Sequence, residues 1–330
     1  MHTIDLINNI LGVFMGISKS KVAVIGAGFV GASAAFALSL NHTVDELVLI
    51  DVNKEKAMGE VMDINHGLPF IGQMSIYAGE YSDCVDCDVI VITAGANRKV
   101  GETRLDLAKK NVTIAKGIIE NIMKYYTKGV ILVVSNPADI LTYMIQKWSG
   151  LPNGKVFGTG TVLDSSRFRY LLSKRFNVDI KNVHGYIIGE HGDSQLPLWS
   201  ATNIAGENID KYSSMMKDIF TEDDKIHIIE EVKKAGSETI RLKGATYYAI
   251  AVIINSIIET LVKNKNTIRT VSSVVNGAYG IYDVALSLPS IIDSNGVSKI
   301  LELNLTEQEM TALQYSIEQI TQILDEVRNL

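Results

Sequence analysis

The chain has 330 residues, of which 47% are hydrophobic and 21% are charged, and these proportions are ordinary for a globular protein with a substantial core. Its net charge of -6 argues against nucleic acid as a partner, because a phosphate-binding surface needs an excess of basic residues. The only two cysteines, Cys84 and Cys87, cannot supply the four ligands of a structural zinc site, so no metal is expected. A redox pair is the alternative, but reduced thiols in a cytoplasmic protein explain them better.

Residues 1–19 form an extension ahead of the first regular pattern. Their apolar residues are interrupted by Asp5, Asn8 and Asn9, without a basic start or a small-residue cleavage site. The segment is therefore unlike a signal peptide, and it is too short to span a bilayer, so no membrane partner is expected. Met15 as the true start and an arm that binds a neighbouring subunit are two explanations, and the sequence leaves both open.

From Lys21 onward, short apolar runs alternate with longer helical segments. A continuous apolar run is typical of a parallel strand that is buried on both faces. We expect strands at residues 22–25, 47–50, 89–92 and 130–134, a small-residue helix at 32–38 and a helix at about 105–126. Pro137 stands where a new helix begins, since its fixed φ suits a first turn. This alternation predicts an α/β, Rossmann-type doubly wound parallel sheet over residues 20–161.

The alternation loosens beyond about residue 162, which indicates a mixed α+β catalytic domain over residues 162–330. We expect helices at about 165–176 and 223–262, with strands at 183–188 and antiparallel strands within 269–288. Thr306 and Glu309 have the spacing of a capping box and open a terminal helix. One apolar face of that helix is expected to pack against the body of the protein; its residues are Met310, Leu313, Ile317, Ile320, Leu324 and Val327.

A glycine pattern follows the first predicted strand. Gly26, Gly28 and Gly31 have the spacing of a dinucleotide-binding turn, and Asp51 ends the second strand about twenty residues later. The first glycine permits the turn, the second lets the backbone approach a pyrophosphate, and the third lets helix and strand pack closely. Asp51 would accept hydrogen bonds from the adenosine ribose and repel a 2′-phosphate, so we expect NAD rather than NADP. A glycine turn without a ligand is the structural alternative.

The strongest candidate for chemistry is His191, within the run 189–193. A lone histidine is more often a satisfied core residue, but further charged groups accompany this one. They lie on an arginine-bearing loop at residues 98–104 and in the run 164–167. Together these supply a proton donor, an aspartate to orient it, and arginines for a carboxylate and a carbonyl. With a hydride carrier, these groups suffice to interconvert a 2-hydroxy acid and a 2-oxo acid.

Six separate motifs carry a family resemblance over nearly the whole chain after Ser20. They read IGAGFVG at 25–31, TAGA at 93–96, GETRL at 101–105, SNP at 135–137, VLDSSRFR at 162–169 and IGEHGD at 188–193. In this order they resemble the lactate/malate dehydrogenase superfamily, and specifically its bacterial L-lactate dehydrogenase branch. A nucleotide-sensing protein without activity is the rival class, because fold alone does not establish function.

The resemblance implies a role for each catalytic candidate. His191 would give a proton to the substrate carbonyl, and Asp164 would fix its tautomer. Arg167 would hold the substrate carboxylate, and Arg104 would polarise the carbonyl from a closing loop. Asn136 would hydrogen-bond near the reacting oxygen and the nicotinamide ribose. Further cofactor contacts are implied for Phe29, Val30, Thr93, Ala94, Gly95, Ser135 and Ile250.

The sequence gives conflicting indications about the substrate. Arg98 stands where malate enzymes typically have arginine and lactate enzymes glutamine, which favours oxaloacetate, because closure over pyruvate would bury an unpaired guanidinium. Glu190, Thr246 and Ile250 match the lactate pattern instead, and Val100 replaces a usual proline in the loop. We expect L-lactate dehydrogenase activity, with malate dehydrogenase as the alternative.

The resemblance also extends to regulation and assembly. Arg169 and His184 match residues that bind fructose 1,6-bisphosphate at a subunit interface in bacterial lactate dehydrogenases. Two side chains that can carry a positive charge suit a phosphate ester, although a structural arginine and a buried histidine are the alternative. The family resemblance implies a cytoplasmic homotetramer with a role in glycolysis and fermentation and allosteric activation by this sugar phosphate.

Overall fold

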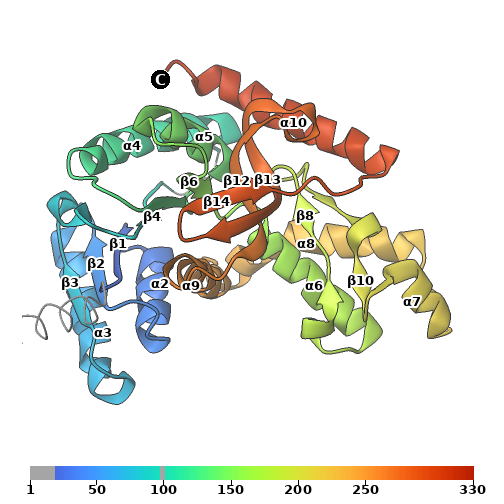
Figure 1. Cartoon of the computed structure of the whole chain (residues 1–330), viewed down its shortest axis with the longest axis horizontal. Helices are drawn as coiled ribbons and strands as arrows, with labels where there is room; N and C mark the ends of the chain where they lie inside the picture. The colour runs from blue at the N-terminus through green and yellow to red at the C-terminus, as the bar shows by residue number, and fades with distance from the viewer. Residues whose placement is uncertain (1–18, 97–100) are drawn as a thin grey trace, which may run out of the picture.

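The computed structural model describes residues 19–96 and 101–330 (Figure 1). The expectations for residues 1–18 lie outside the described residues. So do those for Arg98 and Val100, which fall in the undescribed segment 97–100.

One long sheet forms the centre of the fold, and its first six strands are parallel. They are β1 (Lys21–Ile25), β2 (Glu46–Ile50), β3 (Ser75–Ala78), β4 (Val89–Ile92), β5 (Val130–Val133) and β6 (Val156–Gly158). Their spatial order is β3-β2-β1-β4-β5-β6, which is the order of a dinucleotide-binding sheet. The sequence analysis is therefore confirmed for the doubly wound sheet. Three elements were not expected: the helix α3 (Lys54–Ile71), the three-residue strand β6, and the edge strand β3, which has a single buried residue, Ile76.

Helices cover both faces of the parallel strands. They are α2 (Phe29–Leu40), α3 (Lys54–Ile71), α4 (Arg104–Met123) and α5 (Ala138–Ser149). A capping box of Thr103 and Asp106 begins α4, so the helix starts at the loop arginine. Pro137 was expected where a new helix begins, and this is confirmed, since it is the N-cap residue of α5. Pro137 has extended backbone angles and caps α5 from outside, because its ψ of 118° does not continue a helix.

Three antiparallel strands extend the same sheet beyond β6. They are β12 (Thr267–Asn276), β13 (Tyr282–Asp293) and β14 (Gly296–Ile300). β12 meets β6 where Ser272 pairs with Gly158, and β13 lies between β12 and β14. The antiparallel expectation is confirmed. The boundary predicted at residue 161 stays a prediction, and a continuous sheet runs across it.

Two expected elements of the second half are wrong. The helix expected over residues 223–262 is two helices, α8 (Glu222–Lys243) and α9 (Tyr248–Val262). Gly244 ends α8 with a φ of 87°, a conformation that stops a helix and suits glycine. The strand expected at 183–188 is likewise two short strands in different sheets, β7 (Val183–His184) and β8 (Ile187–Ile188).

The remaining elements of the second half surround these strands. They are α6 (Val162–Phe176), β9 (Leu196–Pro197), β10 (Asn203–Ile204), β11 (Glu207–Asn208), α7 (Ile209–Met215) and the terminal helix α10 (Glu307–Val327). The capping box of Thr306 and Glu309 is present, and the apolar face of α10 packs into the main core as expected. Within residues 19–96 and 101–330, no helix has the length and apolar run needed to cross a membrane.

Candidate active site

The glycine turn lies between β1 and α2 and leaves no room for side chains at two positions. A Cβ at Gly26, whose φ is 107°, would lie 2.8 Å from the backbone nitrogen of Ala94. A Cβ at Gly31 would lie 1.8 Å from the carbonyl oxygen of Gly26. Around Gly28, by contrast, the space is open. The turn therefore brings bare backbone and the N-terminus of α2 to the surface, as a bound pyrophosphate requires.

Asp51 at the end of β2 lies directly across from this turn. One carboxylate oxygen accepts the N–H of Ala27 at 2.6 Å and the other accepts the N–H of Asn53 at 2.8 Å. The carboxylate is thus fixed beside the glycines, with lone pairs left for further donors. A cavity of about 660 Å³ opens here, lined by Gly26, Gly28, Asp51 and residues 93–96 among others. Its position matches the predicted cofactor site.

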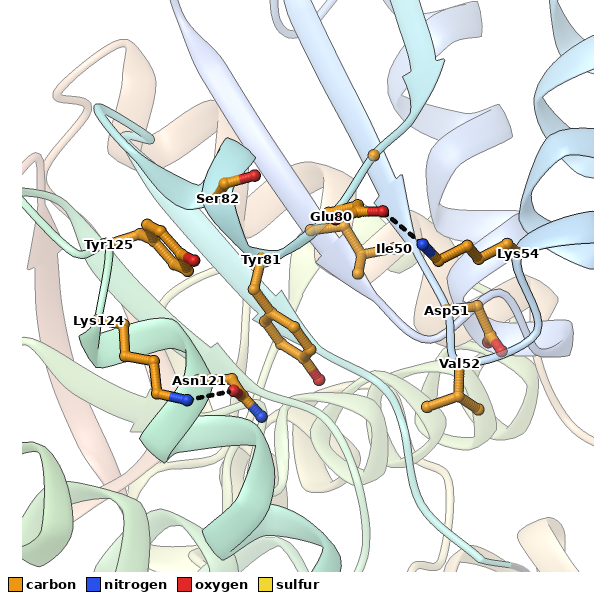
Figure 2. A pocket seen from close by; sticks show the side chains of 11 residues that line it. Ile50, Asp51, Val52, Lys54, Glu80, Tyr81, Ser82, Asn121, Lys124 and Tyr125 are labelled. Atoms are coloured by element: carbon orange, nitrogen blue, oxygen red, sulfur yellow. Dashed lines mark hydrogen bonds and ion pairs between the residues drawn. The ribbon is translucent and has the colours of Figure 1, made fainter.

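A second hollow of about 290 Å³ adjoins this cavity and shares Asp51, Tyr81 and Asn121 with it. Figure 2 shows the Tyr81 side chain extending between those of Asn121 and Asp51. Charged side chains on the rim are paired: Lys54 with Glu80, and Lys124 with the amide oxygen of Asn121. The hollow thus extends the nucleotide cavity away from the glycine turn.

His191 and Asp164 form the centre of a cluster of charged side chains that is separate from the glycine turn. Nδ1 of His191 lies 2.7 Å from the Asp164 carboxylate, and Arg167 donates to the other oxygen of that carboxylate at 3.1 Å. Asp164 is only 3% exposed, whereas a quarter of the His191 side chain is exposed. All three side chains were predicted from the sequence, and the structure brings them together. Asp164 and Arg167 lie on one face of α6, three residues apart.

The pair shifts both pKa values away from their ordinary range. Burial by itself would lower the pKa of His191, but the Asp164 carboxylate more than offsets this and raises it. Burial would raise the pKa of Asp164, and His191 and Arg167 together lower it. The arrangement therefore favours a protonated imidazole against an ionised carboxylate, with Nε2 directed away from Asp164.

A second carboxylate, which the sequence analysis missed, supports the backbone of His191. Asp139 on α5 accepts the His191 N–H at 2.7 Å and the Ser272 hydroxyl at 2.6 Å. It is 3% exposed, and burial raises its pKa to about 6. An acid within the apolar run 138–145 was the one available signal, because a buried carboxylate needs partners.

Arg104 reaches the histidine loop from the first turn of α4. Its guanidinium pairs with the Asp193 carboxylate, two residues after His191. Both side chains are more than half exposed, so the pair itself contributes little to stability. The ion pair nevertheless brings Arg104 close to the loop that carries His191.

The segment between α8 and α9 contacts the glycine turn. The ring of Tyr247 stacks on that of Phe29 with centroids 5.3 Å apart, which places Thr246 near the first turn of α2. Ile250 is buried in the same apolar cluster as Ala27 and Val30. These contacts place Thr246 and Ile250 close to the glycine turn between β1 and α2.

Two family models together match almost the whole chain. Residues 20–158 match the lactate/malate dehydrogenase NAD binding domain, and residues 161–330 match the lactate/malate dehydrogenase alpha/beta C-terminal domain.

The chain belongs to the lactate/malate dehydrogenase family.

Individual relatives agree over nearly their full lengths. An L-lactate dehydrogenase of Thermoanaerobacterium saccharolyticum is 51% identical over 93% of this chain and 99% of its own. A solved L-lactate dehydrogenase from Clostridium thermocellum is similar with 66% identity and a TM-score of 0.84, over 94% of this chain and 99% of its own. The minor L-lactate dehydrogenase of Enterococcus mundtii gives 41% identity and a TM-score of 0.91, over 94% and 98%.

As a member of the lactate/malate dehydrogenase family, the chain is an NAD-dependent dehydrogenase, and the glycine turn with Asp51 fits that cofactor. Three further residues predicted to contact the cofactor, Thr93, Ser135 and Asn136, are held in place by hydrogen bonds near this turn. Thr93 supports the turn by donating to the carbonyl of Gly26 at 3.0 Å, and Ser135 donates to the carbonyl of Ala94 at 2.7 Å. The exposed Asn136 is fixed through its backbone, since its carbonyl accepts from the Asn111 side chain at 2.6 Å.

The predicted effector residues, Arg169 and His184, lie where α6 contacts β7. Arg169 donates to the carbonyls of Val183 at 2.7 Å and Ile180 at 3.3 Å, which places its guanidinium beside the exposed His184. Arg269 is close enough that Arg169, after burial, contributes to lowering its pKa. Arg169 and Arg269 thus form a positively charged cluster near His184, in which His191 takes no part.

Proposed function

We propose that the protein is an L-lactate dehydrogenase that reversibly reduces pyruvate to L-lactate with NADH, with His191 as the acid and base. The observation that carries the proposal is the His191–Asp164 contact of 2.7 Å beside Arg167. The names of the similar proteins, each an L-lactate dehydrogenase, support the choice of substrate.

The proton that reduction requires is held at Nε2 of His191. Nδ1 donates to Asp164, so Nε2 is the nitrogen free to face a substrate oxygen. Bound NADH supplies a hydride to the carbonyl carbon. His191 gives its proton to the oxygen in the same conversion and takes it back in the reverse direction, so charge and protons balance.

The arginines orient and polarise the substrate. Arg167 is 18% exposed and held by Asp164, so its guanidinium is fixed for two-pronged binding of a carboxylate. Arg104, now paired with Asp193, would turn its guanidinium to the carbonyl oxygen and stabilise the charge that develops there. Thr246, close to the first turn of α2, would limit the room for the methyl end of the substrate.

Malate dehydrogenase activity is the second candidate, and one residue favours it. Arg98 would pair with the second carboxylate of oxaloacetate, whereas pyruvate would leave it without an anionic partner. Glu190, Thr246 and Ile250 match the lactate pattern, and we propose that pyruvate is preferred.

Regulation and assembly complete the proposal. Arg169 and His184 would bind fructose 1,6-bisphosphate, supported by their adjacency at β7 and by the nearby Arg269. A cytoplasmic homotetramer would cover exposed apolar side chains on α2, α3 and α9, including Phe36, Met62 and Val252. Sedimentation velocity with and without the sugar phosphate measures this assembly.

Steady-state kinetics with NADH test the function directly. We expect kcat/KM to be much higher for pyruvate than for oxaloacetate, and higher again with fructose 1,6-bisphosphate. A strong preference for oxaloacetate, indifferent to the effector, would make the enzyme a malate dehydrogenase. His191→Asn should abolish turnover and leave NADH binding intact, since His191 lies outside the nucleotide cavity; retained turnover would refute its role.

A further inference from the structure

The loop that carries His191 is held through its backbone by distant parts of the chain. Gly189 exchanges two hydrogen bonds with Ser287 of β13, at 2.9 and 3.0 Å. Asp139 accepts the N–H of His191, and Ser316 accepts the N–H of Glu190. A loop whose amide groups have fixed acceptors keeps one geometry.

Ser316 lies on the terminal helix α10 and is fully buried. Its Oγ accepts the Glu190 N–H at 2.7 Å and lies 3.2 Å from Oγ of Ser194. The hydroxyl of Ser194 donates its single proton to the Glu190 carboxylate, so Ser316 must be the donor to Ser194. The three residues close a hydrogen-bonded ring between the loop and α10.

The ring is tightly enclosed. A Cβ at Gly189, whose φ is 87°, would lie 2.6 Å from Oγ of Ser316. A Cβ at Gly192 would lie 2.6 Å from the carboxylate carbon of Glu190. Neither glycine therefore has room for a side chain, and the loop backbone on both sides of His191 lies close to the ring.

The same helix also contacts the element that carries the loop arginine. Glu326 of α10 pairs with Lys109 of α4 at 3.6 Å, and α4 begins with Arg104. Arg104 in turn pairs with Asp193 of the histidine loop. α10 is thus linked to both sides of the catalytic cluster, although it contributes no side chain to it.

We propose that Ser316 is a positioning residue, through which the C-terminal helix holds the loop so that His191 meets both Asp164 and the substrate. This inference rests on the proposed role of His191. Ser316 acts through the backbone of Glu190 and not on the reacting atoms.

Ser316→Ala tests the inference, with Ile320→Val as the matched control. Ile320 is buried one turn further along α10, and its loss of a methyl group destabilises the fold without removing any hydrogen bond of the ring. We expect Ser316→Ala to lower kcat for pyruvate reduction about 10-fold or more, since small displacements of a catalytic group are costly. The dissociation constant of NADH, measured by fluorescence, should stay unchanged.

The pH profile separates positioning from general loosening. Asp164 and Arg167 on α6 and Asp139 on α5 are the charged groups that act on His191. If the loop moves His191 away from Asp164, the alkaline limb of pyruvate reduction shifts to lower pH in Ser316→Ala and not in Ile320→Val. Equal kinetics and equal pH profiles in the two variants would overturn the inference.

A second variant guards against loss of folding. Ser194→Ala breaks the ring from the loop side while leaving α10 unaltered, and we expect the same shift in the pH profile, smaller in size. An unshifted profile in Ser194→Ala would also contradict the inference. Failure of the proposed function would be recognised separately, as retained turnover in His191→Asn.

Discussion

Replacing Asp164 with asparagine removes a negative charge from beside His191 and keeps the size of the side chain. The carboxylate is almost fully buried and lies 2.7 Å from Nδ1. For charge centres roughly 4 Å apart, an effective dielectric constant of about 20 gives an interaction of about 4 kcal/mol. That energy corresponds to about three pKa units, and together with the contribution of Asp139 it outweighs the lowering of the His191 pKa by burial.

The expected result is a shift in the pH dependence of pyruvate reduction. With His191 as the proposed acid, reduction needs its protonated form, so activity should be present below the pKa of His191 and lost above it. In the wild type this pKa lies above its usual range. In Asp164→Asn the lowering by burial and by Arg167 is opposed only by Asp139, and the midpoint should fall below about 6.5. At pH 8 we expect kcat/KM to fall about 100-fold or more, and at pH 5.5 by much less.

Steady-state kinetics between pH 5 and 10, with NADH saturating, measure this shift. Asp218→Asn is the matched control, because Asp218 pairs with Arg175 at the opposite end of α6.

The free energy of unfolding, measured as a function of pH, is a second test of the same electrostatic interaction. The raised pKa of His191 stabilises the fold below about pH 6.5, and this contribution is lost as the pH rises through the folded pKa. The stability difference between wild type and variant should therefore narrow in alkali. An unshifted midpoint in Asp164→Asn would refute the electrostatic reasoning.

Two further substitutions test residues that the sequence analysis did not identify. Asp139→Asn should lower the free energy of unfolding by about 2–4 kcal/mol in urea denaturation, since His191 and Ser272 lose a charged acceptor. Ser272→Ala is the comparison, for which we expect a smaller loss. Equal losses of stability in the two variants would contradict this role of Asp139. Gly236→Ala on α8 would place a methyl group 3.6 Å from the Arg167 guanidinium, raising helix stability by about 1 kcal/mol. Because the methyl group adds bulk beside the guanidinium proposed to hold the substrate carboxylate, it should raise the KM for pyruvate and leave the dissociation constant of NADH unchanged, and an unchanged KM would contradict this reasoning.

The parts of the site that could be predicted from sequence alone are those built locally. The glycine turn is one example, because the strand, turn and helix that make it are consecutive, and Gly26 and Gly31 leave no room for a side chain. Asp51 follows from the same reasoning, since the next parallel strand ends at the same edge of the sheet. The pairing of His191 with Asp164 spans 27 residues, and it was predicted from the family resemblance.

The features that were missed depend on contacts over long stretches of chain. Ser316 meets Glu190 across 126 residues, and Asp139 meets His191 across 52. Neither a serine in an amphipathic helix nor an aspartate near a helix start carries a local signal of its partner. The break at Gly244 was missed for a different reason. A single glycine is tolerated inside many helices, so only its positive φ reveals the end of α8.

The position of His191 depends on both halves of the molecule. Asp139 comes from α5, in the part that carries the nucleotide-binding sheet, whereas Asp164 and Ser316 come from α6 and α10 in the other part. The three acceptors hold, respectively, the backbone N–H of the histidine, its ring and the preceding N–H. Since each acts on a different atom, no one of them can substitute for another. The geometry of the proposed catalytic acid is therefore a property of the joined halves, and variants that weaken their junction should reduce activity before they unfold the protein.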